Sequence, residues 1–161
     1  MPFLPYPATG IQAYALVFLL GSYSVAALSD LRRMAAQSDF AEVWVAVSGF
    51  LFSVDVYLLL SGALPVESFI IKWVAILALS MVALLMRSAS IAPMDVAAAA
   101  ATAAALPPAS AALYFVFIAV VGELLSPVLR RFGSDGAYPF LPAVFVSSAI
   151  VVCGAFMGAL P

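Results

Sequence analysis

The sequence predicts an all-α polytopic membrane protein with six transmembrane helices and both termini on the extracytoplasmic side. Of its 161 residues, 66% are hydrophobic and only 9% are charged. A soluble domain is about one quarter charged, so the solvent around most of this chain must be lipid. Six spans of ~20 residues nearly exhaust the length. We therefore expect residues 1–161 to form a single membrane-embedded domain in the plasma membrane.

The first three expected spans are separated by short polar or turn-forming segments. Residues 11–28 form an apolar run that ends in a polar segment with two arginines. Residues 43–61 form the second run, which ends at a Gly-Ala-Leu-Pro turn. Residues 69–86 form the third, which ends at Arg87. Each run approaches the length that an α-helix needs to cross the hydrocarbon core.

The fourth expected helix is short and rich in alanine. It begins near Asp95, continues to Leu106 and ends at Pro107-Pro108. Small residues let membrane helices approach closely, so we expect this helix to be central and tightly packed. Residues 111–128 form the fifth span, and residues 140–160 form the sixth.

The arginines support this arrangement. With six spans, all of them fall on one side of the membrane, which the positive-inside rule assigns to the cytoplasm. They are Arg32, Arg33, Arg87, Arg130 and Arg131. Both termini are then expected outside the cell.

The residue types exclude several kinds of chemistry. The chain has no histidine, which excludes histidine-based metal sites, haem ligation and Ser-His-Asp catalysis. Its single cysteine, Cys153, excludes an intramolecular disulfide. We expect no metal and no organic cofactor, and the sequence has no nucleic-acid-binding surface.

Two aspartates fall at the same expected membrane depth, on the cytoplasmic side. Asp30 closes the first span and Asp95 opens the fourth. Two adjacent carboxyl groups that share a proton can activate a water molecule and polarise a peptide carbonyl, as in aspartic proteases. Alternatively, each aspartate simply caps a helix end at the interface.

Three segments resemble signature segments of the archaeal prepilin and preflagellin peptidase family, the GxGD-type intramembrane aspartic peptidases. In the first, Asp30 ends a span and is followed by Arg32-Arg33 and then Ser38-Asp39. In the second, Asp95-Val96 opens a helix of small residues. In the third, Pro139, Phe140 and Pro142 precede the last span.

This resemblance implies an intramembrane aspartic endopeptidase that removes the basic leader of pilin-like or archaellin-like precursors at the cytoplasmic face. It implies that Asp30 and Asp95 are the catalytic pair. The sequence departs from the family pattern in two places. Ala92-Pro93-Met94 replaces the glycines before the second aspartate, and Ala97 replaces a basic residue.

The other charged residues allow more than one interpretation. Asp55 and Lys72 fall at similar depth in neighbouring spans and are expected to form a structural ion pair. Glu123 either modulates the aspartate pair or accepts a hydrogen bond elsewhere. We place Asp39 and Glu42 in the loop beside Asp30, where they either bind the basic leader or are simply solvated.

Two alternatives to the peptidase remain open from sequence. An inactive homologue would serve as an assembly subunit, which the altered Gly-x-Gly segment favours. A small ion-coupled transporter or channel would use Asp55 and Glu123 as ion or proton sites. The sequence does not indicate an oligomeric state.

Overall fold

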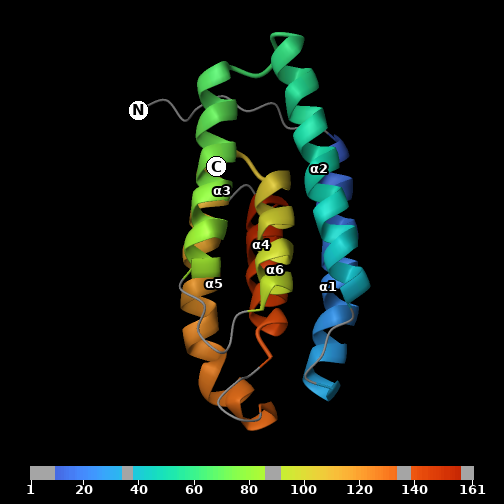
Figure 1. Cartoon of the computed structure of the whole chain (residues 1–161), viewed down its shortest axis with the longest axis vertical. Coiled ribbons are helices and arrows are strands. Elements are labelled where there is room, and N and C mark those ends of the chain that lie inside the picture. Colours follow the sequence, from blue (N-terminus) through green and yellow to red (C-terminus); the bar gives the residue numbers. More distant parts are fainter. Residues whose placement is uncertain (1–9, 34–37, 86–91, 134–138, 157–161) are drawn as a thin grey trace.

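The computed structural model describes residues 10–33, 38–85, 92–133 and 139–156, and this part of the chain is helical with no strand. The predicted all-α class is therefore confirmed. The helices are α1 (Gly10–Arg33), α2 (Ser38–Leu60), α3 (Val66–Leu85), α4 (Pro93–Ala105), α5 (Pro108–Leu129), the 3₁₀ turn η1 (Arg130–Phe132) and α6 (Leu141–Phe156) (Figure 1). Arg87 and both chain ends lie outside the described residues.

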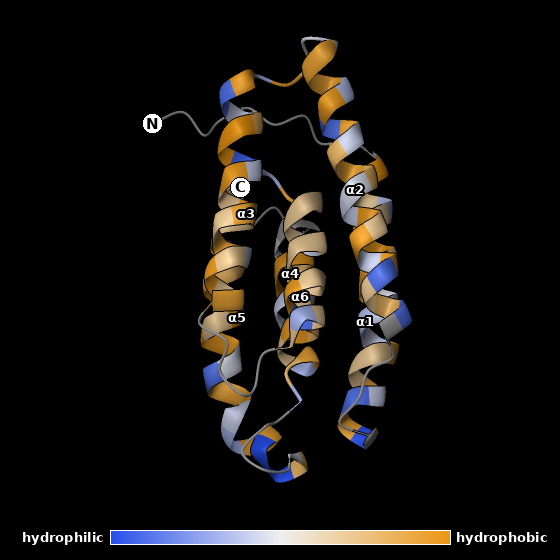
Figure 2. Ribbon diagram, viewed as in Figure 1, coloured by the Kyte–Doolittle hydropathy of each residue, from blue (hydrophilic) through white to orange (hydrophobic). Residues whose placement is uncertain are grey.

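Four helices are long and apolar enough to cross a bilayer. They span Gly10–Arg32, Asp39–Leu60, Val66–Leu85 and Pro108–Phe132, and Leu141–Gly154 is a shorter apolar helix. Their outward faces carry many large apolar side chains, so hydrophobic colouring dominates the outside of the bundle (Figure 2). Such a surface fits a lipid environment.

Helix α4 is the central element that the alanine run predicts. Its 13 residues span about 20 Å at 1.5 Å per residue, which is shorter than the hydrocarbon core. It contacts each of the other α-helices, and most of its residues are buried. Alanine side chains permit these close approaches, and Pro107-Pro108 prevents the helix from continuing.

One end of the bundle gathers segments that are distant in sequence. The C-terminal end of α1, the start of α4, the end of α5 with η1 and the start of α6 all lie at the lower end in Figure 1. The α2–α3 turn lies at the opposite end. The packing of α1 against α6 and of α4 against α1 and α6 brings Asp30, Asp95 and Leu141 to this lower end.

The structure corrects the boundary between the first loop and the second helix. We expected Asp39 and Glu42 in a loop, but α2 begins at Ser38 and both residues lie in its first turns. Acidic side chains in a first helical turn favour this earlier start, because they complement the macrodipole. Hydropathy alone placed the boundary at the first apolar residue and missed these polar turns.

Candidate functional site

Asp30 lies near the C-terminal end of α1 and is only 7% exposed. Its carboxylate accepts a hydrogen bond from the backbone N–H of Leu141. Leu141 is the first residue of α6, and the N–H groups of a first helical turn have no partner within the helix. The donor that holds Asp30 is therefore one that helix geometry leaves available.

Asp95 lies in the first turn of α4 and is 4% exposed. Its Oδ2 accepts a hydrogen bond of 2.7 Å from the backbone N–H of Ala92, the residue that precedes the helix. Pro93 begins the helix, and its fixed φ suits a first helical position. The sequence Ala-Pro-Met-Asp thus forms an ordinary helix start without the glycines of the family pattern.

The two carboxyl groups are close enough to interact electrostatically. Each is held by one backbone N–H at the N-terminal end of a helix, α6 for Asp30 and α4 for Asp95. The positive ends of two helix dipoles therefore converge on two buried carboxyl groups. Asp95 therefore combines the helix-capping contact that the sequence offered as one interpretation with an electrostatic interaction with Asp30.

A cavity of about 160 Å³ opens beside Asp95. Its other lining side chains are apolar and come from α3, α4, α5 and the residue before α6: Ala83, Val96, Ala99, Phe115, Ile118, Ala119 and Phe140. Asp95 is the one ionisable group in this lining. The cavity thus offers an apolar space with a carboxyl group at its edge.

Phe140 connects this cavity to the packing of α5 against α6. A Cβ atom added at Gly122 would lie 3.0 Å from Cε2 of Phe140. Gly122 therefore provides the space that the aromatic ring occupies. The ring immediately precedes Leu141, whose N–H holds Asp30, so the same contact affects both the cavity and that hydrogen bond.

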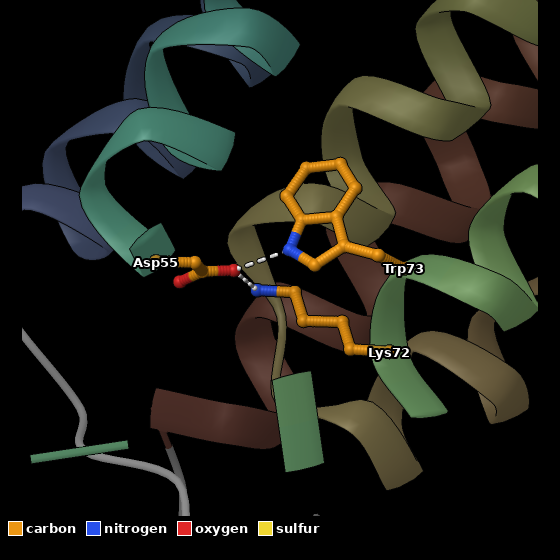
Figure 3. Close-up of polar contacts among 3 residues, drawn as sticks. All are labelled: Asp55, Lys72 and Trp73. Atoms are coloured by element: carbon orange, nitrogen blue, oxygen red, sulfur yellow. Dashed lines mark hydrogen bonds and ion pairs between the residues drawn. The ribbon is translucent and has the colours of Figure 1, made fainter. Parts of the chain in front are cut away.

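Asp55 of α2 and Lys72 of α3 form a buried ion pair (Figure 3). Lys72 Nζ lies 2.8 Å from Asp55 Oδ2, and the same oxygen accepts a hydrogen bond of 3.0 Å from Trp73 Nε1. Asp55 is 1% exposed and Lys72 is fully buried. The structure thus brings together the two residues expected to form a structural ion pair.

The other acidic residues that the sequence singled out near this site, Glu123, Asp39 and Glu42, have exposed side chains. The side chain of Glu123 is exposed on α5, whereas its neighbour Gly122 is the residue that faces inward. Glu123 thus does not supply a buried modulating charge. Asp39 and Glu42 are exposed near the α1–α2 end of the bundle, on α2 rather than in the expected loop.

Sequence reasoning did not anticipate a chain of buried hydroxyl groups two turns deeper in the bundle. Tyr23, Thr102, Tyr114 and Ser148 are each at most 1% exposed and are linked by hydrogen bonds. One signal was available, because Thr102 is the only polar residue in the alanine run. Within the described residues, no group of three or more Asp, Glu, Cys or His side chains could hold a metal ion.

No family model, no curated protein and no solved structure matches this chain. The case for a function therefore depends on the residues and their arrangement.

Proposed function

We propose that this chain is an intramembrane aspartic endopeptidase whose catalytic residues are Asp30 and Asp95. The proposal rests on two buried carboxyl groups from separate helices that influence each other electrostatically and are each anchored by a helix N-terminal N–H. Two carboxylates buried close together repel each other, and the repulsion is relieved when one of them is protonated. The arrangement therefore fits a dyad that holds one proton between two carboxyl groups.

The chemistry requires no metal. The ionised carboxylate takes a proton from a water molecule, and the water oxygen attacks the peptide carbonyl carbon. The protonated carboxyl donates its proton to the carbonyl oxygen. Collapse of the tetrahedral intermediate breaks the C–N bond: the proton held by the first carboxyl goes to the leaving amine, and the second carboxyl takes a proton back from a hydroxyl of the gem-diol, which restores the shared proton. The two backbone N–H donors keep the carboxyl groups in position throughout these steps.

The proposed topology has six membrane-inserted helices, with α4 as a short helix in the interior and both termini outside the cell. Arg32, Arg130 and Arg131 lie at the same end of the bundle as the aspartate pair. By the positive-inside rule this end faces the cytoplasm, so the active site of a plasma membrane enzyme would open there. A substrate would reach it from the cytoplasmic surface.

We propose pilin-like or archaellin-like precursors as substrates, on the strength of the three resembling segments. Such precursors carry a basic leader before an apolar helix. The apolar cavity beside Asp95 offers space for a side chain of that helix, and the exposed acids Asp39 and Glu42 offer opposite charge to the leader.

The role of these two acids gives a direct test. The double substitution Asp39→Asn with Glu42→Gln should raise KM for a basic leader several-fold and leave kcat nearly unchanged, because it removes only long-range attraction. Raising the salt concentration should likewise raise the KM of the unaltered protein, because salt screens the same attraction. An unchanged KM would mean that the two side chains are simply solvated.

The proposal as a whole is tested by co-expression with a panel of pilin-like and archaellin-like precursors, followed by immunoblotting. Shortened precursor should appear with the unaltered chain and disappear with Asp30→Asn or Asp95→Asn. Glu67→Gln is the matched control, since Glu67 is an exposed carboxylate in the first turn of α3 at the opposite end of the bundle. Full-length precursor throughout, in membranes that contain folded protein, would refute the peptidase.

A second candidate is an inactive homologue that acts as an assembly subunit. Two observations favour it: Ala92-Pro93-Met94 stands in place of the family glycines, and Asp95 makes an ordinary helix-capping contact. This candidate predicts stable association with a membrane partner and no cleavage. A transporter has less support, because Asp55 is neutralised by Lys72 and Glu123 is exposed.

A further inference from the structure

The buried hydroxyl groups form an ordered relay across four helices. The Tyr23 hydroxyl donates a hydrogen bond of 2.6 Å to the backbone carbonyl of Ala98 and accepts one of 3.0 Å from Thr102 Oγ1. Thr102 Oγ1 lies 3.3 Å from Ser148 Oγ, which lies 2.8 Å from the Tyr114 hydroxyl. These contacts link α1, α4, α6 and α5.

The donor and the acceptor of each hydrogen bond in this relay follow from the number of hydrogens that a hydroxyl can donate. A hydroxyl has one hydrogen to donate, and that of Thr102 goes to Tyr23. Ser148 must therefore donate to Thr102, and Tyr114 must donate to Ser148. All hydroxyls then point the same way, toward the Ala98 carbonyl, which is the arrangement in which successive hydrogen bonds strengthen one another.

The relay lies on the same helix faces as the aspartate pair. Tyr23 precedes Asp30 by two turns of α1, and Thr102 follows Asp95 by two turns of α4. Residues separated by two turns share a face of an α-helix. The Tyr23–Ala98 hydrogen bond therefore fixes the rotation and the height of α1 relative to α4 at the faces that carry the two aspartates.

The Tyr23 ring is itself held in place. Its centroid lies 5.1 Å from that of Trp44 in an edge-to-face arrangement, and Trp44 Nε1 donates a 2.9 Å hydrogen bond to Ser22 Oγ. Around the Tyr23 ring, the buried side chains of α1 and α4 that pack together are mostly small or apolar, among them Ala26, Ala98 and Ala101, and such surfaces can slide past one another. The Tyr23–Ala98–Thr102 contact supplies the directional hydrogen bonds that specify the register here.

We infer that Tyr23 is a positioning residue that sets the α1–α4 register and thereby the separation of the Asp30 and Asp95 carboxyl groups. The inference rests on the proposed function for its catalytic consequence, although the geometric part stands without it. Loss of the hydroxyl would let α1 shift relative to α4. Since a displacement of about 1 Å can cost on the order of 100-fold in rate, kcat should fall while KM changes little.

The geometric part is tested by disulfide cross-linking, which needs no peptidase activity. In a Cys153→Ser chain, cysteines are introduced by Asp30→Cys and Asp95→Cys, and the rate of cross-linking with copper phenanthroline is measured in detergent. Adding Tyr23→Phe, which keeps the ring, should slow cross-linking by about tenfold if register controls the approach. Thr102→Val should slow cross-linking too, whereas Thr102→Ser, which keeps a hydroxyl, should cross-link at the parent rate.

Two matched variants separate positioning from general stability. Tyr114→Phe removes an equally buried hydroxyl from the α5–α6 end of the relay and leaves the Tyr23–Ala98 contact intact. Tyr14→Phe makes the same change at an 80% exposed site on α1. Both should cross-link at the parent rate, even where Tyr114→Phe lowers the unfolding temperature as much as Tyr23→Phe does.

The outcomes are distinguishable. Equal cross-linking rates in the Tyr23 and Tyr23→Phe chains, or slowing by Tyr114→Phe to the same degree, would overturn the positioning role. No cross-linking in the parent pair would overturn the convergence of the two sites and with it the inference. Slowed cross-linking with no cleavage of any precursor by the unaltered chain would uphold the positioning role and count against the peptidase alone.

Discussion

Among individual residues, the buried ionisable side chains in the described part of the chain follow one physical rule, which is that each has a polar or charged partner. Asp55 is bonded to Lys72 and Trp73, and Asp30 and Asp95 are each bonded to a backbone N–H. A buried charge without a partner costs several kcal/mol. The difference between the two sites is that Asp55 has a cationic partner, whereas Asp95 is influenced electrostatically by a second carboxyl group, that of Asp30.

The ion pair of Asp55 and Lys72 predicts a large loss of stability when the cationic partner alone is removed. Lys72→Met should destabilise the folded protein by about 3–5 kcal/mol, because it leaves Asp55 buried and unpaired. Combining it with Asp55→Asn should recover most of the loss, since the amide still accepts from Trp73. The unfolding temperature in detergent, followed by circular dichroism, measures both. If Lys72→Met unfolds like the unaltered chain, Asp55 is not buried as described.

Among the helices, the N-terminal ends of α4 and α6 provide the hydrogen-bond donors of the candidate site. Both aspartates are held by N–H groups that an α-helix leaves without internal partners, at Ala92 before α4 and at Leu141 in α6. Prolines at the first turns of both helices, Pro93 and Pro142, add no competing N–H donors. The site is therefore built from the ends of α4 and α6 and from the last turn of α1.

Disturbing the approach to α6 should disturb this site. Gly122→Leu places side-chain atoms where the Phe140 ring lies, 3.0 Å from the position of an added Cβ atom. We expect a loss of about 1–3 kcal/mol from overpacking. The rate of precursor cleavage should fall even in preparations that remain folded, because Phe140 precedes Leu141 and lines the cavity. Gly21→Leu is the control, since nothing lies within 4 Å of a Cβ atom there.

The sequence was sufficient to predict most elements, for a physical reason. Apolar runs bounded by Arg, Pro and Gly mark membrane helices strongly, and the alanine run marked α4 as the packed centre. It was also sufficient to pair Asp55 with Lys72, because both fall in neighbouring apolar runs where an isolated charge is costly. It could not orient Glu123, because the apolar residues around that position leave the inward face of α5 undetermined.

Long-range hydrogen bonds were beyond the reach of sequence patterns. The hydrogen bonds from the Leu141 N–H to Asp30 and from the Tyr23 hydroxyl to Ala98 join segments that lie far apart in the sequence, 75 residues apart in the second case. Backbone donors and acceptors are present at every residue, so no composition identifies the ones that form a site. The first turns of α2 were missed for a related reason, since Asp39 and Glu42 have a polar character that a hydropathy pattern assigns to a loop.

At the scale of the whole molecule, the account requires one end of the bundle to face the cytoplasm. Single cysteines introduced by Arg131→Cys and Glu67→Cys into a Cys153→Ser chain lie at opposite ends of the bundle. In intact cells, a membrane-impermeant maleimide should label Glu67→Cys and should label Arg131→Cys only after permeabilisation. The reverse labelling pattern would place the aspartate pair at the outer surface and would rule out cleavage of a precursor from the cytoplasmic face.

If Asp30 and Asp95 activate water to cleave a peptide bond, the oxygen of that water must enter the product. The most direct measurement is cleavage of a pilin-like precursor by the purified protein in ¹⁸O-enriched water, read by mass spectrometry of the released leader. The account predicts a leader whose new terminal carboxylate carries one ¹⁸O atom, and no leader from Asp30→Asn or Asp95→Asn. Unlabelled leader, or intact precursor with a folded preparation, would contradict it.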